Sequence, residues 1–358
     1  MSLKTKSLMD KIDVRWPAEW EPQEAVWLSW PHREDLWQGG LEALYDTFGS
    51  VASAIAPYAQ VRINAAESLH RGIEEVLMSK GVKKDTYRLY PHPTNDVWCR
   101  DHGPIFVREL VSGGLCLTDW QFNAWGGKFA PWDLDNKIPH LIGDSLGLAR
   151  RESEMILEGG AIEGNGAGLL LTTEAVLLNP NRNPEWSKDA VEAELKRMLG
   201  VSSIFWLGRG IEGDDTDGHI DDMVRFIRED AVVSIVEKNS KSPHYQALSE
   251  NNERLQEMRT VDGHRVEIIP LPMPDALVAT DWRLEQLPAS YANFLIVNEA
   301  VIVPIFDQKR NDDRALGILR EVFPKQKVIG VDARRLVIEG GAIHCITQQQ
   351  PQTGVTNQ

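Results

Sequence analysis

A cysteine near the carboxyl end of the chain has the type and setting for chemistry. Cys345 follows the pair Gly340-Gly341 and precedes a strand-like Ile-Thr. Glycines let the backbone approach a ligand closely, and a cysteine just after such a turn is a candidate nucleophile. A lone cysteine is more often a small buried hydrophobic residue. The residues that could surround Cys345 therefore decide between the two interpretations.

The first polar cluster spans residues 95–104, with the sequence Asn-Asp-Val-Trp-Cys-Arg-Asp-His-Gly-Pro. It holds two aspartates, an arginine, a histidine and a tryptophan ahead of an apolar, strand-like run. A loop stabilised by an Arg–Asp pair and Asx turns would have this composition. Two nearby carboxylates can also clamp a guanidinium group, whose donors form a planar fork.

The second polar cluster, residues 213–222, carries five aspartates and His219 and leads into another strand. On an extended backbone His219 and Asp221 point to the same face. A calcium loop would need a glutamate at its twelfth position, where Val224 or Arg225 falls here. A lone His-x-Asp is weak evidence for zinc. The cluster therefore predicts no metal site.

A glycine-rich motif occurs twice. Glu158-Gly159-Gly160-Ala161-Ile162 reappears as Glu339-Gly340-Gly341-Ala342-Ile343. Both copies lie near strand-like sequence, so the repetition could mark a shared turn without a shared function. Alone, the Glu158 carboxylate is typical of an exposed turn.

Taken together, the chain offers one cysteine, one histidine and several carboxylates beside glycine-rich turns. A thiolate with an imidazole is an arrangement for nucleophilic catalysis. Surrounding acids would raise the pKa of the thiol, which is harmful unless a bound cation offsets them. These residues therefore point to a cationic electrophile, and a guanidinium carbon fits.

The composition excludes some classes of partner. The chain has 358 residues, 42% hydrophobic and 25% charged, with a net charge of -15. This acidity argues against nucleic acid or an anionic membrane as the main partner. Three cysteines at unpatterned spacing indicate a reducing, cytoplasmic compartment. Residues 1–16 lack an apolar core for a signal peptide, and the apolar run 294–306 is too short to span a bilayer.

Faint repeats indicate the organisation of the chain. An acidic residue followed by Ala-Val and an apolar run recurs at Glu24, Glu174, Asp230 and Glu299, and another unit fits around residues 103–120. About five units result. Periodicity and end signals predict helices over 41–58, 68–80, 183–199, 242–258 and 311–322. The predicted strands are 25–30, 61–65, 105–109, 115–120, 168–172, 175–178, 223–227, 232–236, 266–269, 294–297 and 301–305. Alternating strands and helices without a flexible linker predict an α/β fold in a single catalytic domain, 1–358.

The motifs together resemble the agmatine deiminases, within the bacterial-type peptidylarginine deiminase family and the guanidino-group-modifying superfamily. The matching stretches follow the family order over most of the chain: 95–104, 158–160, 214–221, 290–294 and 340–347. The resemblance implies a five-bladed α/β propeller (pentein) of pseudo-repeated ββαβ-like units, with the site in its central channel.

The resemblance also implies roles for individual residues. Cys345 is the implied nucleophile and His219 the general acid and base. Asp96 and Asp221 are the implied guanidinium clamps, and Glu158 orients His219. Trp98 and Asp214 are weaker candidates for binding the far end of the substrate. The family needs no metal or organic cofactor, and a homo-oligomer is compatible with it.

The implied reaction converts agmatine to N-carbamoylputrescine and ammonia, through a covalent amidino-cysteine, in putrescine and polyamine biosynthesis. Alternatives are a deiminase of free or peptidyl arginine that yields citrulline, an amidino transferase, and a polyamine-binding protein without catalysis. Two departures from the family pattern, Glu339 in place of a glycine and Ala342 in place of a polar residue, leave the substrate more open than the reaction class.

Overall fold

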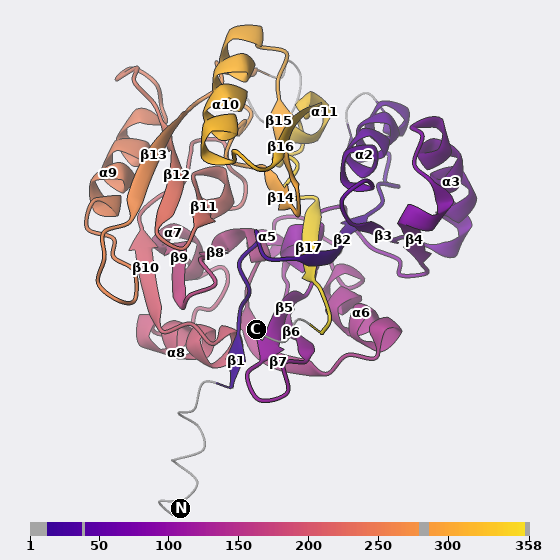
Figure 1. Ribbon diagram of the computed structural model, residues 1–358, viewed down its shortest axis with the longest axis horizontal. Helices are drawn as coiled ribbons and strands as arrows, with labels where there is room; N and C mark the ends of the chain where they lie inside the picture. The colour runs from indigo at the N-terminus through magenta and orange to yellow at the C-terminus, as the bar shows by residue number, and fades with distance from the viewer. Residues whose placement is uncertain (1–12, 38–39, 279–285, 355–358) are drawn as a thin grey trace, which may run out of the picture.

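The computed structural model describes residues 13–37, 40–278 and 286–354. Within these ranges the strands form five separate sheets. In Figure 1 the sheets lie around the middle of the molecule and the longer helices lie toward its outside. This mixed α/β architecture confirms the predicted fold class.

The five sheets contain the following strands, given in chain order within each sheet. The first sheet contains β2 (Gln23–Ser29), β3 (Gln60–Asn64), β4 (Tyr87–Tyr90) and β17 (Thr347–Pro351), and the second contains β1 (Val14–Arg15), β5 (Ile105–Glu109), β6 (Leu115–Gln121) and β7 (Arg150–Ile156). The third sheet contains β8 (Ile162–Gly164), β9 (Leu169–Thr173) and β10 (Ser203–Leu207), and the fourth contains β11 (Val224–Arg228), β12 (Ala231–Val236) and β13 (Glu267–Pro272). The fifth sheet contains β14 (Leu295–Val297), β15 (Ala300–Ile305) and β16 (Lys327–Asp332).

All five sheets share one connection scheme. A first strand pairs antiparallel with a central strand, which then pairs parallel with the next strand of the chain. Parallel neighbours need a crossover connection, and one longer helix supplies it between the central strand and the next strand of each sheet. These crossover helices are α2 (Leu41–Ile55), α6 (Ile138–Leu146), α8 (Lys188–Leu199), α9 (Tyr245–Leu255) and α10 (Lys309–Val322).

The remaining helices are short or flank the crossovers. They are α3 (His70–Ser79), α4 (Cys99–His102), α5 (Ala124–Gly127), α7 (Glu174–Leu177) and α11 (Arg334–Val337), with single 3₁₀ turns η1 (Glu67–Leu69), η2 (Lys84–Thr86), η3 (Asp135–Lys137), η4 (Gly159–Ala161) and η5 (Ile220–Asp222). No helix in the described ranges is both long enough and apolar enough to cross a bilayer.

One sheet is assembled from both ends of the chain. Its first strand, β17, comes from the carboxyl end and pairs antiparallel with β2, so that Thr347 lies opposite Leu28. The polar run after Thr347 is not among the predicted strands, but here it is largely buried. This pairing places Cys345 directly before the first strand of a sheet.

Two local predictions are wrong. The strand predicted over 175–178 is absent: residues 174–177 form the helical turn α7, because the strand of that unit is β9, which ends at Thr173. Such a short apolar run has no periodicity to separate the two structures. The helix predicted from residue 183 begins at Lys188. Ser187 caps it by accepting a hydrogen bond from the Ala190 N–H (3.2 Å), while the Asn183 side chain binds the backbone of Ile156.

Candidate active site

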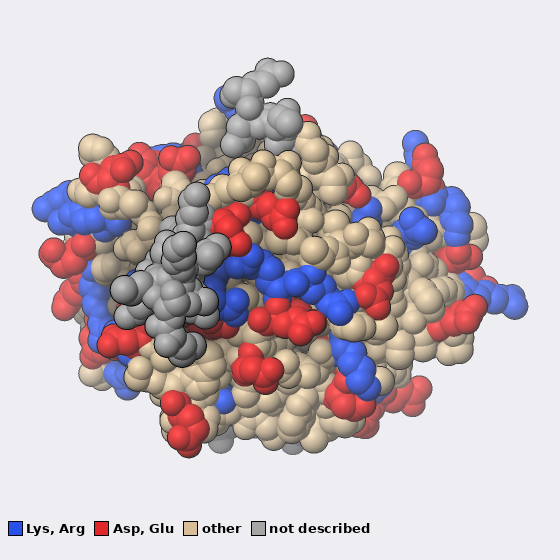
Figure 2. Space-filling view, turned by 90° about the horizontal axis from the view of Figure 1, so that it is seen from below, with Lys and Arg blue, Asp and Glu red and all other residues tan. Residues whose placement is uncertain are grey.

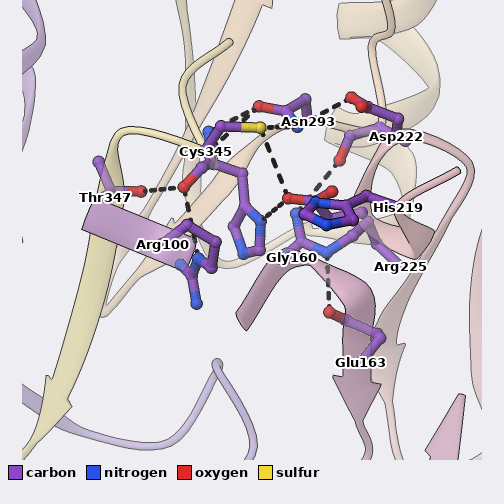
Figure 3. A network of polar contacts seen from close by, with 12 residues as sticks. Arg100, Gly160, Glu163, His219, Asp222, Arg225, Asn293, Cys345 and Thr347 are labelled. Carbon is purple, nitrogen blue, oxygen red and sulfur yellow. Dashed lines mark hydrogen bonds and ion pairs between the residues drawn. The ribbon is translucent and has the colours of Figure 1, made fainter. Parts of the chain in front are cut away.

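Five segments of the chain meet at one place, and each lies shortly before the strand that pairs antiparallel with the central strand of its sheet, namely β5, β8, β11, β14 or β17. Figure 3 shows part of this meeting point. The polar residues that these segments contribute are Asp101 ahead of β5, Glu158 ahead of β8, His219 and Asp221 ahead of β11, Asn293 ahead of β14 and Cys345 ahead of β17. The shared connection scheme therefore brings together residues that are far apart in sequence.

Cys345 lies at the inner end of a cavity and is only 4% exposed. Its Sγ accepts a hydrogen bond from Asn293 Nδ2 at 3.0 Å and lies 3.7 Å from Asp221 Oδ2. Burial raises the pKa of the thiol well above its usual range, and the nearby carboxylates of Asp221, Asp222 and Asp101 raise it further. The free protein therefore holds a neutral thiol at pH 7.

The glycine pair ahead of Cys345 is required by packing. A Cβ on Gly341 would lie 2.3 Å from the Trp98 ring and 2.9 Å from Cys345 Cβ, and Gly340 has a φ of 105°. The predicted close approach of the backbone is confirmed, and the group that it approaches is the tryptophan that walls the cavity.

His219 is fully buried, and among the described residues neither ring nitrogen has a hydrogen-bond partner. Two carboxylates stand slightly farther away, Asp101 at 3.7 Å from Nδ1 and Glu158 at 4.0 Å from Nε2. Burial lowers the pKa of the imidazole, but these carboxylates outweigh it and raise the pKa above its usual value. An imidazole with this surrounding can hold a proton and donate it to a ligand.

The first Glu-Gly-Gly copy supports this histidine. A Cβ on Gly160 would lie 2.6 Å from His219 Nδ1 and 3.2 Å from Asp221 Oδ2, so only glycine leaves room here. Glu158 is fully buried and accepts a hydrogen bond from Arg182 Nε at 2.8 Å. Its other oxygen faces His219, the position expected for a group that orients the ring.

The two aspartates of the first polar cluster differ in depth. Asp96 lines the cavity, and its Oδ1 accepts a hydrogen bond from the Val97 N–H at 2.8 Å. Asp101 also lines the cavity but lies beside His219, and its carboxylate accepts hydrogen bonds from Trp125 Nε1 and the Gly160 N–H, both at 3.0 Å. Burial raises the pKa of Asp101 to about 6.

Asp96 was the predicted clamp and Asp101 had no predicted role, although Asp101 is the aspartate that lies with the imidazole. The repeated units could have indicated Asp101. It lies four residues before the start of β5, and Glu158 lies four residues before the start of β8.

Asp221 is held by a histidine that had no predicted role. Its Oδ2 accepts a hydrogen bond from His344 Nδ1 at 2.7 Å, while Oδ1 is buried without a partner among the described residues. His344 Nε2 lies 2.9 Å from Glu19, which pairs with Arg225 at 2.8 Å. Burial raises the pKa of Asp221, but the hydrogen bond and charge of His344 reverse this and leave the pKa lowered. Asp221 is therefore ionised and oriented, with one oxygen left to bind a cation.

The cavity above Cys345 combines aromatic and acidic walls. The aromatic residues are Trp37, Trp98, Trp125 and Phe129, and the acidic residues are Asp96, Asp101, Asp215 and Glu339. Among the described residues that line the cavity there is no lysine or arginine. These walls suit an elongated cation with an apolar middle.

Of the two weaker candidates, only Trp98 lines this cavity. The Asp214 carboxylate turns back to its own loop, where it accepts hydrogen bonds from the Thr216 N–H (2.8 Å) and the His219 N–H (3.0 Å). Asp214 therefore stabilises the conformation of its own loop, and its neighbour Asp215 lines the cavity instead.

One group of side chains has the spacing of a metal site. The ligand atoms of Asp221, Asp222 and Cys345 lie within 4.8 Å of one another. Burial, together with the charge of Asp221, raises the pKa of Asp222 well above its usual range. Asp222 also accepts a hydrogen bond from Asn293 at 2.9 Å.

Comparison with known proteins places this site in a family. The model of the Porphyromonas-type peptidyl-arginine deiminases matches residues 15–351. The agmatine deiminase of Medicago truncatula is 38% identical, over 94% of this chain and 96% of its own, and that of Pseudomonas aeruginosa 36% identical, over 94% and 95%. The solved structure of Enterococcus faecalis agmatine deiminase superposes with a TM-score of 0.89 at 34% identity, covering 95% of this chain and 96% of the other. The chain therefore belongs to the Porphyromonas-type peptidyl-arginine deiminase family.

Proposed function

We propose that this protein is a hydrolase that deiminates agmatine to N-carbamoylputrescine and ammonia, a step toward putrescine. The observation that carries the proposal is that Cys345 lines an acid-walled cavity with ionised Asp221 3.7 Å from its sulfur, while His219 lies 3.7 Å from Asp101 of the same cavity wall. The similarity to agmatine deiminases over nearly the full chain supports the substrate.

In the first half-reaction the substrate guanidinium pairs with Asp221 and Asp101, which hold its carbon in front of the Cys345 sulfur. The positive charge lowers the pKa of the thiol, which releases its proton to solvent, and the thiolate attacks the carbon to form a C–S bond. The C–N bond then breaks, and the departing nitrogen takes a proton from the His219 imidazolium and leaves as ammonia. Asp96, at the cavity wall, remains a second candidate for the clamp.

In the second half-reaction a water molecule attacks the amidino carbon and gives a proton to neutral His219. The C–S bond breaks and the electron pair returns to sulfur, which takes the second water proton and becomes a thiol again. The water oxygen stays on the carbon as the carbonyl of the product. Glu158 holds the imidazole between these two proton transfers. No step requires a metal or an organic cofactor.

The cavity walls favour agmatine over arginine. An α-carboxylate would need a cationic partner at the cavity, and none of the described residues that line it is a lysine or an arginine. Three arginines of the chain also have other partners. Arg100 binds Gln349, Arg225 binds Glu19 and Glu163, and Arg209 pairs with Glu250. Ammonia release from agmatine, free arginine and a peptide ending in arginine separates the three substrates. Faster release from arginine would contradict the proposal.

The covalent step is tested by mass spectrometry of protein quenched during turnover with agmatine. We expect an amidino adduct on Cys345 alone. Cys345→Ser should bind agmatine without releasing ammonia, and Cys116→Ala is the matched control that should keep the adduct, because Cys116 lies in β6 away from the cavity. Binding of agmatine by the wild type without ammonia release would favour a polyamine-binding protein.

We further propose that the five sheets are the blades of a five-bladed α/β propeller within one catalytic domain. Their common connection scheme, and the polar residues that meet ahead of their first strands, support this arrangement. Three free thiols fit a cytoplasmic location. A small guanidino cation is the proposed partner. On the face in Figure 2 basic side chains form a short band with acidic side chains beside it, which is a poor surface for nucleic acid.

A further inference from the structure

Asn293 occupies the place in its unit that catalytic candidates occupy in the other four. It lies two residues before the start of β14, as Cys345 lies two residues before β17, and Glu158 lies four residues before β8. The residue is fully buried. In Figure 3 its side chain lies between the sulfur of Cys345 and the carboxyl group of Asp222. The stretch 290–294 is one of the family motifs, but Asn293 had no predicted role.

The contacts of Asn293 determine which way its amide points. Oδ1 faces two backbone donors, the N–H of His344 at 2.9 Å and the N–H of Cys345 at 3.3 Å. A backbone N–H can only donate, so the oxygen must be on this side. The NH₂ group is then directed at Cys345 Sγ (3.0 Å) and at Asp222 Oδ1 (2.9 Å).

This amide donor acts against the carboxyl groups near the sulfur. Burial and the charges of Asp221, Asp222 and Asp101 raise the pKa of the Cys345 thiol, and the backbone N–H of Ala342 lowers it. Asp221 is ionised and cannot donate a hydrogen bond to a thiolate. Among the described side chains, Asn293 is the donor that the structure places on Sγ.

We propose that Asn293 is a further catalytic residue, whose amide N–H stabilises the Cys345 thiolate when it forms and again when it leaves the amidino carbon. A preorganised donor of this kind lowers the energy of the charged sulfur without reorganisation. The inference rests on the proposed function, because it takes Cys345 as the nucleophile.

The test measures the thiol without substrate and the reaction with it. Asn293→Asp keeps the oxygen that the two backbone N–H groups need and replaces the NH₂ group by an acceptor. Asn293→Leu removes the donor without adding charge. In both variants we expect the midpoint of Cys345 alkylation by iodoacetamide to move to higher pH. We also expect kcat with agmatine to fall about 10²–10³-fold, with KM nearly unchanged, since removal of one oxyanion donor has an effect of that size.

Asn165→Asp is the matched control. Asn165 is also buried, its Oδ1 accepts two backbone N–H groups, and its Nδ2 donates to the Glu229 carbonyl rather than to a thiol. It should lose thermal stability as Asn293→Asp does, but keep the alkylation profile and kcat of the wild type.

The outcomes separate this inference from the proposed function. If the wild type releases ammonia while Asn293→Asp keeps the wild-type alkylation midpoint and kcat, Asn293 is structural and the inference is wrong. Failure of the wild type to release ammonia would overturn the proposed function, and the alkylation midpoints would still decide whether Asn293 stabilises the thiolate. If Asn293→Leu does not fold, Asn293→Asp alone decides.

Discussion

The two copies of Glu-Gly-Gly-Ala-Ile have the same sequence and opposite roles for their glutamates. In the first copy Glu158 is fully buried against Arg182 and faces His219. In the second copy Glu339 lines the cavity. The first copy runs straight into β8 at Ile162, whereas Cys345 and its neighbours separate the second copy from β17. The two copies have the same sequence but lie at different distances from the strand that follows them.

What the copies share is the use of glycine where no side chain fits. Gly160 leaves room for His219, and Gly341 leaves room for Trp98 and Cys345. The repetition therefore marks two close approaches of backbone to the reacting groups. It does not mark two equivalent carboxylates, so mutating the copies in parallel should give unequal results.

The largest difference is expected between the glutamates. Glu158→Gln should lower kcat about 10²–10⁴-fold, the usual worth of a positioned acid–base group, because His219 loses the carboxylate that orients it. Removing one partner of a buried ion pair also lowers the free energy of unfolding, by up to about 3–5 kcal/mol. The loss should be smaller here because Arg182 still pairs with Asp217. Steady-state kinetics and thermal unfolding measure both. An active Glu158→Gln would remove the proposed difference between the copies.

The glycines should behave alike in stability and differently in kinetics. Gly160→Ala and Gly341→Ala should each lower the free energy of unfolding by about 1–3 kcal/mol, as overpacking does. Gly160→Ala displaces His219 and should mainly lower kcat, whereas Gly341→Ala displaces Trp98 and should also raise KM. Gly317→Ala, in open space on α10, is the control. Equal kinetic defects in both variants would contradict this division.

The pH dependence of kcat/KM should follow the ionisation of Asp101, whose carboxylate accepts a hydrogen bond from Gly160 of the first copy. Burial raises the pKa of Asp101 to about 6, so below this pH the group is neutral and attracts a cation less. We expect kcat/KM to fall as the pH drops through about 6, whereas Asp221, whose pKa is lowered, stays ionised there. Asp96→Asn should keep this acid limb, and Asp101→Asn should abolish it along with most activity. The reverse result would return the clamp to Asp96.

The smallest effect is expected at Glu339, whose carboxylate is at the cavity wall. Glu339→Gln should raise the KM for agmatine by up to about fivefold, as expected for a solvated ion pair worth about 0.2–1 kcal/mol, and leave kcat unchanged. A kcat loss as large as that of Glu158→Gln would mean that both glutamates act on the reacting groups.

Much of this site was predictable from residue types and motifs. Cys345, His219, Glu158 and Asp221, which the family resemblance named, lie close together in the structure, and the number of acids in the motifs was enough to indicate a cationic substrate. Asp101 was passed over because nothing local separates it from Asp96. Asn293 and His344 were missed because an amide and a second histidine have no local pattern that signals a partner far away in the chain. The short run at 175–178 was wrong because helix and strand look alike at that length.

The sequence by itself determined the α/β class, the repeated units and the inventory of reactive groups, since these depend on local periodicity and side-chain chemistry. Only the tertiary structure decided which aspartate accompanies His219, which amide reaches the sulfur and which histidine orients Asp221. Those choices depend on the pairing of β17 with β2 and on the common position ahead of each first strand. They are long-range contacts, and no local pattern encodes them.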